Sequence, residues 1–300
     1  MDLVRNVPRF RGLAWRLGRR LYMHARGEQK SGDMLSNGEA WLQRSVVGAV
    51  PVNVPLQVID IGANHGEWTF NLTDGLPAER RRMGNWCVEL FEPVPSTADI
   101  LSKRIAASTD KGHLSLNRIA VSSGPGTARM AVMSSTGGTN TIHFDGREGA
   151  VPPGGWVDVP TRSLSDFAFE KGIGHIHLAK CDTEGHDANV LAGAKALLEK
   201  GAIDVIQFEY NQRWVFARSF LRDVFDLVDG LPYRVVRVDT RSVEVFDAWH
   251  SELERFFQSN YALVREPILA WLPCSRGSFG GSNTFEPGAG ANAHEHTSNG

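Results

Sequence analysis

The sequence predicts an α/β protein with a mostly parallel, Rossmann-like sheet and helices on both of its faces. From residue 56 onward, short runs of β-branched residues alternate with segments of helical periodicity. The first run, residues 57–61, breaks at Gly62 and gives way to helical spacing, which is typical of a parallel strand that feeds a crossover helix. A chain of 300 residues with 42% hydrophobic content can bury the core that such a sheet needs.

The predicted elements alternate along the chain. Each strand is a short apolar run, and each helix repeats apolar residues three or four positions apart. After the first run, strands are predicted over residues 86–91, 113–116 (continuing to 122), 127–133, 157–160, 175–181, 203–208, 233–238 and 261–264. Helices are predicted over residues 39–50, 68–72, 96–107, 163–169, 187–199, 220–228 and 252–257. This order indicates that residues 51–273 form one domain.

Residues 1–50 are predicted to form a basic helical extension. Between residues 4 and 26, seven arginines are interleaved with aromatic residues and leucines, which is typical of a basic amphipathic helix. Such a helix could make peripheral contact with an anionic membrane surface or capture an acidic substrate. We favour a third interpretation, in which the helix packs its apolar stripe on the domain, because arginine is abundant throughout this chain.

Two further segments differ from the rest in composition. Residues 134–156 are rich in serine, threonine and glycine and are too long for a simple connector, so we expect a substrate-side loop insertion. Residues 274–300 contain mainly small and polar residues without periodicity. We expect this segment to be a disordered tail.

Composition limits the possible partners and the compartment. The net charge of −2 gives no electrostatic reason to expect nucleic acid. No run approaches the roughly 18 apolar residues of a transmembrane segment. The three cysteines, Cys87, Cys181 and Cys274, are far apart, which indicates reduced thiols and a cytoplasmic protein. The oligomeric state stays unknown at this stage.

Acidic residues follow several of the predicted strands, where open parallel sheets bind their ligands. Asp60 lies in the first of these turns, and its negative charge would repel the pyrophosphate of a dinucleotide. The same charge would attract a sulfonium ion, so Asp60 favours S-adenosylmethionine over NAD. Glu92 lies a little over twenty residues beyond Gly66, the offset at which a carboxylate reaches ribose hydroxyls.

Four sequence blocks together carry a family resemblance: VIDIGANHG (58–66), FEP (91–93), KCDTEGH (180–186) and IQFEYN (206–211). In order and spacing, over residues 56–270, they resemble the FkbM family of S-adenosylmethionine-dependent methyltransferases. The resemblance implies a class I methyltransferase fold, with a seven-stranded sheet whose last strand is antiparallel. It also implies methyl transfer to a hydroxyl oxygen of a small molecule, such as a sugar of a glycolipid or secondary metabolite. Cys181 replaces an aliphatic residue of the family pattern, a change expected to affect packing only.

The resemblance, carried over residue by residue, assigns two groups of site residues. The expected cofactor-binding residues are Asp60, Gly62, Ala63, Asn64, Gly66, Glu92, Ala120, Val121 and Asp182. The expected catalytic residues, which would orient the acceptor hydroxyl and take its proton, are Asp182, Glu184, His186 and Glu209. His186 is attractive as a base by its ordinary pKa, and Asp182 and Glu184 are attractive by position. His143 is a further candidate base.

Several alternatives stay open. Asp182, Glu209 and Asn211 could together bind Mg²⁺, although they could equally hydrogen-bond a sugar, and no metal site is assigned. A nucleotide-dependent oxidoreductase would need a G-x-G-x-x-G turn, but Asn64 stands where the middle glycine belongs. A non-catalytic cofactor-binding module has no reason to keep the strand-end acids. A nucleic-acid methyltransferase is disfavoured by the charge and by the absence of an aromatic-plus-Asn-Pro signature.

Overall fold

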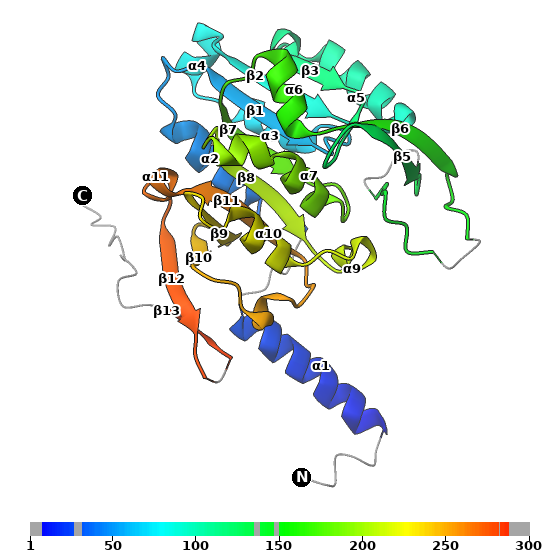
Figure 1. Ribbon diagram of the computed structural model, residues 1–300, viewed down its shortest axis with the longest axis vertical. Helices are drawn as coiled ribbons and strands as arrows, with labels where there is room; N and C mark the ends of the chain where they lie inside the picture. Colours follow the sequence, from blue (N-terminus) through cyan, green and yellow to red (C-terminus); the bar gives the residue numbers. More distant parts are fainter. Residues whose placement is uncertain (1–7, 27–31, 135–138, 147–149, 282, 288–300) are drawn as a thin grey trace.

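The chain folds around one large sheet, which Figure 1 shows with its helices. The computed structural model describes residues 8–26, 32–134, 139–146, 150–281 and 283–287. The strands of the large sheet lie in the order β13-β12-β10-β9-β11-β8-β7-β1-β2-β3. Their bounds are β1 (Leu56–Ile61), β2 (Trp86–Phe91), β3 (Leu114–Asn117), β7 (Ile176–Cys181), β8 (Ile203–Tyr210), β9 (Tyr233–Val238), β10 (Val243–Phe246), β11 (Ser259–Arg265), β12 (Cys274–Phe279) and β13 (Phe285–Pro287). A second sheet has the order β4-β6-β5 and comprises β4 (Ala120–Val121), β5 (Gly126–Ala131) and β6 (Trp156–Arg162).

The central part of the large sheet confirms the predicted fold class. β1 pairs in parallel with β2 and β7, β2 pairs in parallel with β3, and β7 pairs in parallel with β8. β11 lies between β8 and β9 and is antiparallel to both. Seven neighbouring strands, in the order β9-β11-β8-β7-β1-β2-β3, therefore form the mostly parallel sheet that the family resemblance implies. β11, the last of them along the chain, is the antiparallel strand.

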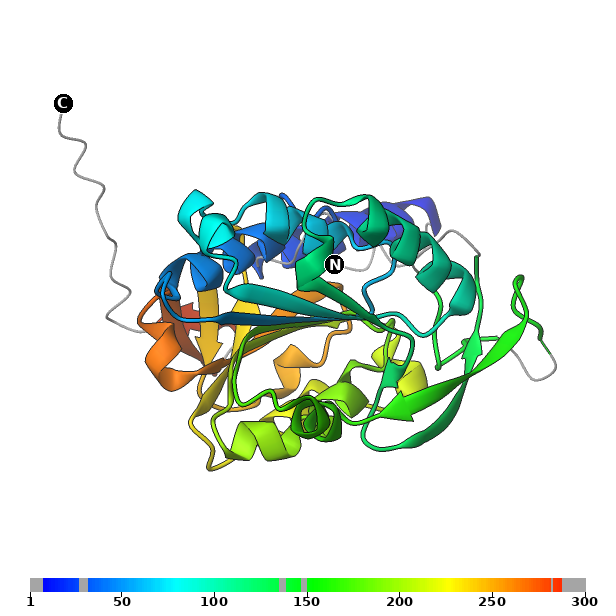
Figure 2. The same cartoon turned by 90° about the horizontal axis from the view of Figure 1, so that it is seen from above.

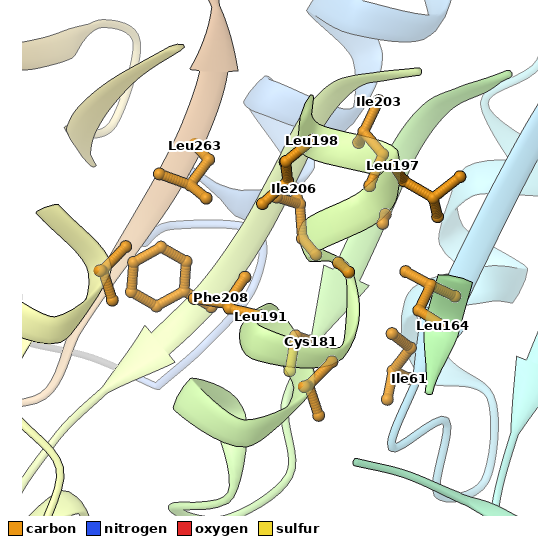
Figure 3. Close-up of a cluster of buried hydrophobic side chains, with 14 of the residues drawn as sticks. Ile61, Leu164, Cys181, Leu191, Leu197, Leu198, Ile203, Ile206, Phe208 and Leu263 are labelled. Atoms are coloured by element: carbon orange, nitrogen blue, oxygen red, sulfur yellow. The ribbon is translucent and has the colours of Figure 1, made fainter. Parts of the chain in front are cut away.

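Helices cover both faces of the sheet, as Figure 2 shows from above. One apolar cluster joins the sheet to α2 (Glu39–Ala49), α3 (Glu67–Asp74) and α5 (Pro95–Ala107). On the opposite face, the second cluster involves α6 (Leu164–Lys171), α7 (Asp187–Gly193), α8 (Lys195–Glu199) and α10 (Leu221–Val228). Figure 3 shows this second cluster, in which Cys181 packs among leucine and isoleucine side chains. The remaining helices are α1 (Pro8–Ala25), α4 (Ala78–Met83), α9 (Trp214–Ala217) and α11 (Glu266–Leu269), and short 3-10 turns form at η2 (Lys111–His113) and η3 (Ser251–Leu253).

The sheet is wider than the sequence predicts. β10 adds to β9, β12 adds to β10, and β13 folds back on β12. The expectation of a disordered tail over 274–300 is therefore wrong for its first part, and residues 288–300 lie outside the described residues. The segment pairs through its backbone and has few β-branched residues to signal a strand. Phe279 and Phe285 secure it by packing against Phe246, at ring distances of 6.4 Å and 5.4 Å.

The predicted helix over 252–257 is also wrong, because only η3 forms there. The carboxylate of Glu254 accepts hydrogen bonds from the backbone N–H groups of Leu221 and Arg222 at the start of α10. These donors would otherwise lack a partner in the first turn of α10. Glu254 therefore caps another helix instead of continuing its own.

The N-terminal helix forms as predicted, but it does not pack its apolar stripe on the domain. Phe10, Leu13, Leu17 and Leu21 of α1 are all more than half exposed, and the helix projects from the rest of the molecule in Figure 1. The last turns of α1 alone provide its described contacts with the domain, through Tyr22 and its neighbours. Among the described helices, none is long and apolar enough to cross a membrane.

Replacing Gly277 by alanine tests the edge hairpin. A Cβ at Gly277 would lie 2.1 Å from the backbone oxygen of Glu286, so β13 must move away, at a cost of about 1–3 kcal/mol. Gly281→Ala is the matched control, because a Cβ there meets nothing within 4 Å. We expect faster amide hydrogen exchange in β12 and β13 for Gly277→Ala only. Unchanged exchange in Gly277→Ala would contradict the pairing of β12 with β13.

Candidate active site

The register of the central strands brings their carboxyl ends to one edge of the sheet. Ile61 at the end of β1 pairs with Phe91 of β2 and with Cys181 of β7. Cys181 in turn pairs with Phe208 of β8. The residues that directly follow these four positions are Gly62, Glu92, Asp182 and Glu209. Four positions far apart in the sequence thus meet at the edge where such sheets bind ligands.

A cavity with about 560 Å³ of empty space, which we call the strand-end cavity, opens at this edge. The predicted site residues on its wall are Gly62, Asn64, Glu92, Ala120, Val121, Asp182, Glu184 and His186. Of the remaining predictions, Asp60, Ala63 and Gly66 do not line it, and Glu209 lines a neighbouring groove instead. Phe91, Pro93, Ile119, Met130, Asn140, Ile142 and Thr183 also contribute to its wall, and the sequence prediction missed them as cavity residues.

The glycines of the first turn allow close packing of backbone. Gly62 has a φ of +79°, and a Cβ there would lie 1.9 Å from the backbone oxygen of Asp182. Gly66 has a φ of +84°, and its Cβ would meet Leu101 and Phe70 at 2.9 Å. Both positions therefore require glycine. Gly62 does so while lining the cavity, whereas Gly66 shapes the start of α3 from outside it.

Asp60 does not occupy the place that the sequence analysis expected. Its carboxylate is fully buried, and its Oδ2 accepts a hydrogen bond of 2.6 Å from the Thr69 hydroxyl. Burial raises the pKa of Asp60, while the nearby Lys180 ammonium and the Thr69 hydroxyl act in the opposite direction. Asp60 pairs in register with Lys180 of β7. The positive charge near Asp60 is therefore Lys180 of the protein itself. Through Thr69, the Asp60 carboxylate connects the end of β1 to α3.

Glu92 is placed on the cavity wall with its carboxylate held by backbone. Oε2 accepts a hydrogen bond from the N–H of Asn64 at 3.1 Å, and Oε1 accepts one from the N–H of Val94 at 2.9 Å. Burial raises the pKa of Glu92 to about 7, although these two hydrogen bonds counteract it. Each carboxylate oxygen has a second lone pair, so Glu92 can also accept from a diol in the cavity.

Four carboxyl groups, those of Asp182, Glu184, Asp187 and Glu209, are close enough to perturb one another at the ends of β7 and β8. Burial and the charge of Asp182 raise the pKa of Glu184 and that of Asp187 to about 7 each. Burial, followed by the charges of Asp182, Glu184 and Asp187, raises the pKa of Glu209 to about 8. Near neutral pH this cluster therefore retains protons, as crowded buried carboxyls do.

Two cations compensate part of this negative charge. Lys180 Nζ donates to Asp182 Oδ2 at 3.0 Å, and Arg213 Nε lies 2.9 Å from Glu184 Oε2. Burial acts to lower the pKa of Lys180, but the carboxylates of Asp182, Glu39 and Asp60 outweigh it and the pKa is raised. Lys180 belongs to the KCDTEGH block of the family resemblance, whereas Arg213 lies outside all four blocks.

Glu184 is held in an unusual backbone conformation. Its φ is +56°, in the left-handed region that few residues other than glycine adopt. The Thr141 hydroxyl donates a 2.8 Å hydrogen bond to its backbone oxygen, and Arg213 pairs with its side chain. Such conformations persist where surrounding contacts enforce them, often at functional sites. Glu184 is also the residue that lines both the strand-end cavity and the neighbouring groove.

His186 is unsuited to act as a base, contrary to the sequence expectation. Its Nδ1 lies 2.9 Å from Nε2 of His143, and its Nε2 lies 2.9 Å from the Ser122 hydroxyl. Burial, with a smaller effect of His143, lowers the pKa of His186 to about 4, and burial also lowers the pKa of His143. Both nitrogens of His186 are engaged and its basicity is low, so the three side chains form a positioning network at the cavity wall.

A groove with about 1000 Å³ of empty space, which we call the lateral groove, adjoins the cavity at Glu184. Besides Glu184, its wall comprises Arg19, Met23, Gly32, Glu209, Asn211, Gln212, Arg213, Phe256, Phe257 and Gln258. The N-terminal helix thus shapes the groove through Arg19 and Met23. The described part of the 134–156 loop contributes Asn140 and Ile142 to the strand-end cavity instead. No local motif marks Phe256, Phe257 or Gln258, because tertiary folding alone brings this segment beside β8.

The oxygen atoms considered for Mg²⁺ are engaged in hydrogen bonds. The two carboxylate oxygens of Glu209 accept from the side-chain amides of Gln258 and Asn211, each at 2.7 Å. Asn211 Oδ1 accepts from the N–H of Arg213 at 2.8 Å, and Asp182 pairs with Lys180. Three of these carboxylate oxygens thus already have amide or ammonium partners, and we derive no step through a magnesium ion.

The raised pKa values predict that the protein loses stability as the pH rises from about 6.5 to about 8.5. A carboxyl whose pKa is higher in the folded state stabilises the fold while it is protonated, and this contribution disappears as the pH passes the folded-state pKa. The lowered pKa of His186 has the opposite effect, but below this range. Over the same pH range, the free energy of unfolding of Glu209→Gln should fall by about 1–2 kcal/mol less than that of the parent. Urea unfolding at the two pH values measures this, and equal losses in both proteins would exclude the raised pKa of Glu209.

Comparison with known proteins identifies the family. A model described as the methyltransferase FkbM domain matches residues 60–235. A methyltransferase FkbM structure from Methylobacillus flagellatus KT is 14% identical, with a TM-score of 0.42, over 73% of this chain and 47% of that one, so the chain spans about half of that protein. Precorrin-6y C5,15-methyltransferase from Geobacter metallireducens GS-15 is 10% identical (75% and 85% covered, TM-score 0.36). Aeropyrum pernix fibrillarin with bound S-adenosyl-L-methionine is 11% identical (74% and 73% covered, TM-score 0.36).

A comparison with curated proteins finds no match. Since the family model covers more than half of the chain, the protein belongs to the FkbM family of methyltransferases, and this membership supports methyl transfer from S-adenosylmethionine.

Proposed function

We propose that the protein is an S-adenosylmethionine-dependent O-methyltransferase acting on a hydroxyl of a small molecule, a sugar of a glycolipid or secondary metabolite. The observation that carries this proposal is the place of Glu184 on the wall shared by the strand-end cavity and the lateral groove. A carboxylate there faces a cofactor on one side and an acceptor on the other. We assign the activity to residues 51–273. Cys87, Cys181 and Cys274 are all free thiols, which supports a cytoplasmic location.

The strand-end cavity fits S-adenosylmethionine in the chemistry of its walls. Ile119, Ala120 and Val121 line it with apolar side chains that suit adenine. The Glu92 carboxylate suits the ribose diol, because a charged acceptor can take hydrogen bonds from both hydroxyls. The buried Asn64 Oδ1 has no hydrogen-bond partner among the described residues, and it can accept from the ammonium of the methionine portion.

The sulfonium would lie near Asp182 and Glu184. Both carboxyls line the cavity, and a positive charge there favours their ionised forms. Asp182, at the end of β7, would therefore attract the sulfonium, which is the role expected of Asp60 from the sequence.

The lateral groove suits a neutral, polyhydroxylated acceptor. Its amide side chains, those of Asn211, Gln212 and Gln258, can donate to and accept from hydroxyls, and Phe256 and Phe257 offer apolar surface to the face of a ring. These features favour a sugar over a nucleic-acid acceptor.

In the proposed reaction, the bound cofactor supplies an activated methyl group on sulfur. The chain must hold the acceptor oxygen in line with that methyl and remove its proton. Glu184 takes the proton as the new O–C bond forms and the methyl–sulfur bond breaks, with S-adenosylhomocysteine as the leaving group, since a pKa of about 7 suits a general base at neutral pH. Arg213 fixes the Glu184 side chain, and Glu209, with its higher pKa, hydrogen-bonds the acceptor.

Glu184→Gln tests the base. With radiolabelled S-adenosylmethionine and a panel of methyl glycosides, we expect the parent to form O-methyl products, identified by mass spectrometry. The variant should lose about 10²- to 10⁴-fold in kcat while binding the cofactor with similar affinity.

In the parent, kcat/KM should rise as the pH increases through about 7, because the base acts when deprotonated. Arg218→Gln, directly after α9, is the control, because Arg218 lines neither the cavity nor the groove. Methylation of RNA or of amines but not of glycosides would contradict the proposed acceptor, and full activity of Glu184→Gln would contradict the base.

Cofactor binding should also release protons near neutral pH. The sulfonium lowers the pKa of Glu184, and a decrease of about one unit releases about 0.4 proton per site at pH near 7. S-adenosylhomocysteine is the matched control, because it lacks only the methyl group on sulfur and, with it, the positive charge. Calorimetry in buffers of different ionisation enthalpy measures the difference between the two ligands. We expect this difference to shrink in Glu184→Gln. Equal proton release by both ligands in the parent would place the sulfonium away from Glu184.

A further inference from the structure

The N-terminal helix α1 presents an apolar stripe that no described part of the molecule covers. Phe10, Leu13, Leu17 and Leu21 recur three or four positions apart and so share one face of the helix. Their exposed fractions are 61%, 59%, 57% and 60%. Exposing four large apolar side chains in one row opposes folding in water and is typical of a surface that binds something.

The charges of α1 are all positive. The helix contains five arginines and no aspartate or glutamate. At 100° of rotation per residue, Arg16 and Arg20 flank the apolar stripe on one side and Arg11 flanks it on the other. An apolar face bordered by arginines is the arrangement of helices that lie in the plane of a membrane surface, where acyl chains take the stripe and anionic headgroups take the arginines.

We infer that α1 is a docking helix for an anionic lipid surface. A second copy of the chain fits less well, because two stripes would bring their flanking arginines together. A stripe of four residues is also far smaller than the 20 to 30 residues a side, roughly, of a stable interface. A nucleic acid would pair with the arginines but leave the apolar side chains in water. A lipid surface satisfies both features of the helix.

The base of α1 is attached next to the lateral groove. Tyr22 donates a 3.0 Å hydrogen bond to Glu252, and the Arg19 guanidinium lies 4.6 Å from the ring centre of Phe257. Arg19, Phe257 and Met23 all line the groove. A membrane that binds α1 would therefore lie close to the groove. If the proposed function holds, the acceptor that reaches the groove is then a hydroxyl of a lipid headgroup.

Vesicle co-sedimentation of the full chain, without cofactor or acceptor, tests the docking helix. We expect binding to phosphatidylcholine vesicles that contain about 30% phosphatidylglycerol, little binding to pure phosphatidylcholine, and weaker binding at high salt. Leu17→Glu should reduce binding roughly tenfold or more, because it places a charge in the apolar stripe. Phe169→Glu is the matched control: Phe169 is 86% exposed on α6, and its substitution should leave binding unchanged. Arg16→Gln with Arg20→Gln should reduce binding by about 25-fold, at about fivefold per charge.

Four outcomes would overturn the inference. They are no binding by the parent, equal binding to both kinds of vesicle, unchanged binding by Leu17→Glu, and a dimer in solution that Leu17→Glu dissociates. Binding of a short RNA that competes with the vesicles and survives Leu17→Glu would likewise assign α1 to nucleic acid. Thermal unfolding and cofactor calorimetry confirm that each variant is folded. Because vesicle binding needs no methyl transfer, its failure is distinguishable from failure of the proposed function.

Discussion

The candidate site depends on how the negative charge at the ends of β7 and β8 is compensated. Glu184, Asp187 and Glu209 lie largely away from water beside the more exposed Asp182, while two cations, Lys180 and Arg213, form ion pairs with Asp182 and Glu184. Without further positive charge, the cluster keeps protons near neutral pH. A sulfonium would supply that charge. The same crowding that disfavours ionisation in the free protein therefore favours a cationic ligand, and it gives Glu184 a pKa suited to take a proton.

The position of Glu184 follows from contacts between distant segments. Its left-handed backbone is enforced by Thr141 from the loop between β5 and β6 and by Arg213 after β8. The adjacent Gly185 has a φ of +100°, and a Cβ there would meet Arg213 at 2.9 Å. The turn after β7 therefore packs closely against both segments. These contacts hold Glu184 between the cavity and the groove, and they link the loop between β5 and β6 to the loop after β8.

The elements added to the central sheet extend the protein toward its surroundings. The β12–β13 hairpin widens the sheet at the edge farthest from β3, and aromatic packing on Phe246 holds it there. The α1 helix borders the lateral groove at its C-terminal end and leaves its apolar stripe exposed along the rest of its length. The lateral groove thus combines the ends of β7 and β8 with α1 and the segment before β11, whereas the strand-end cavity combines the strand ends with β4, β5 and the loop that follows β5.

The sequence by itself determined the parallel sheet, the glycine turn and the acids at the strand ends. Local patterns carry this information: an apolar run such as 57–61 buries both faces of a strand, and the glycine at position 62 marks where the strand ends. Only the tertiary structure decided which acids line the cavity. Asp60 pairs in register with Lys180 and turns inward, and Asp182 and Glu184 line the cavity. The structure alone also showed that His143 hydrogen-bonds His186, that Gln258 hydrogen-bonds Glu209 and that β12 pairs with β10. Such contacts join residues far apart in the chain and leave no periodicity to detect.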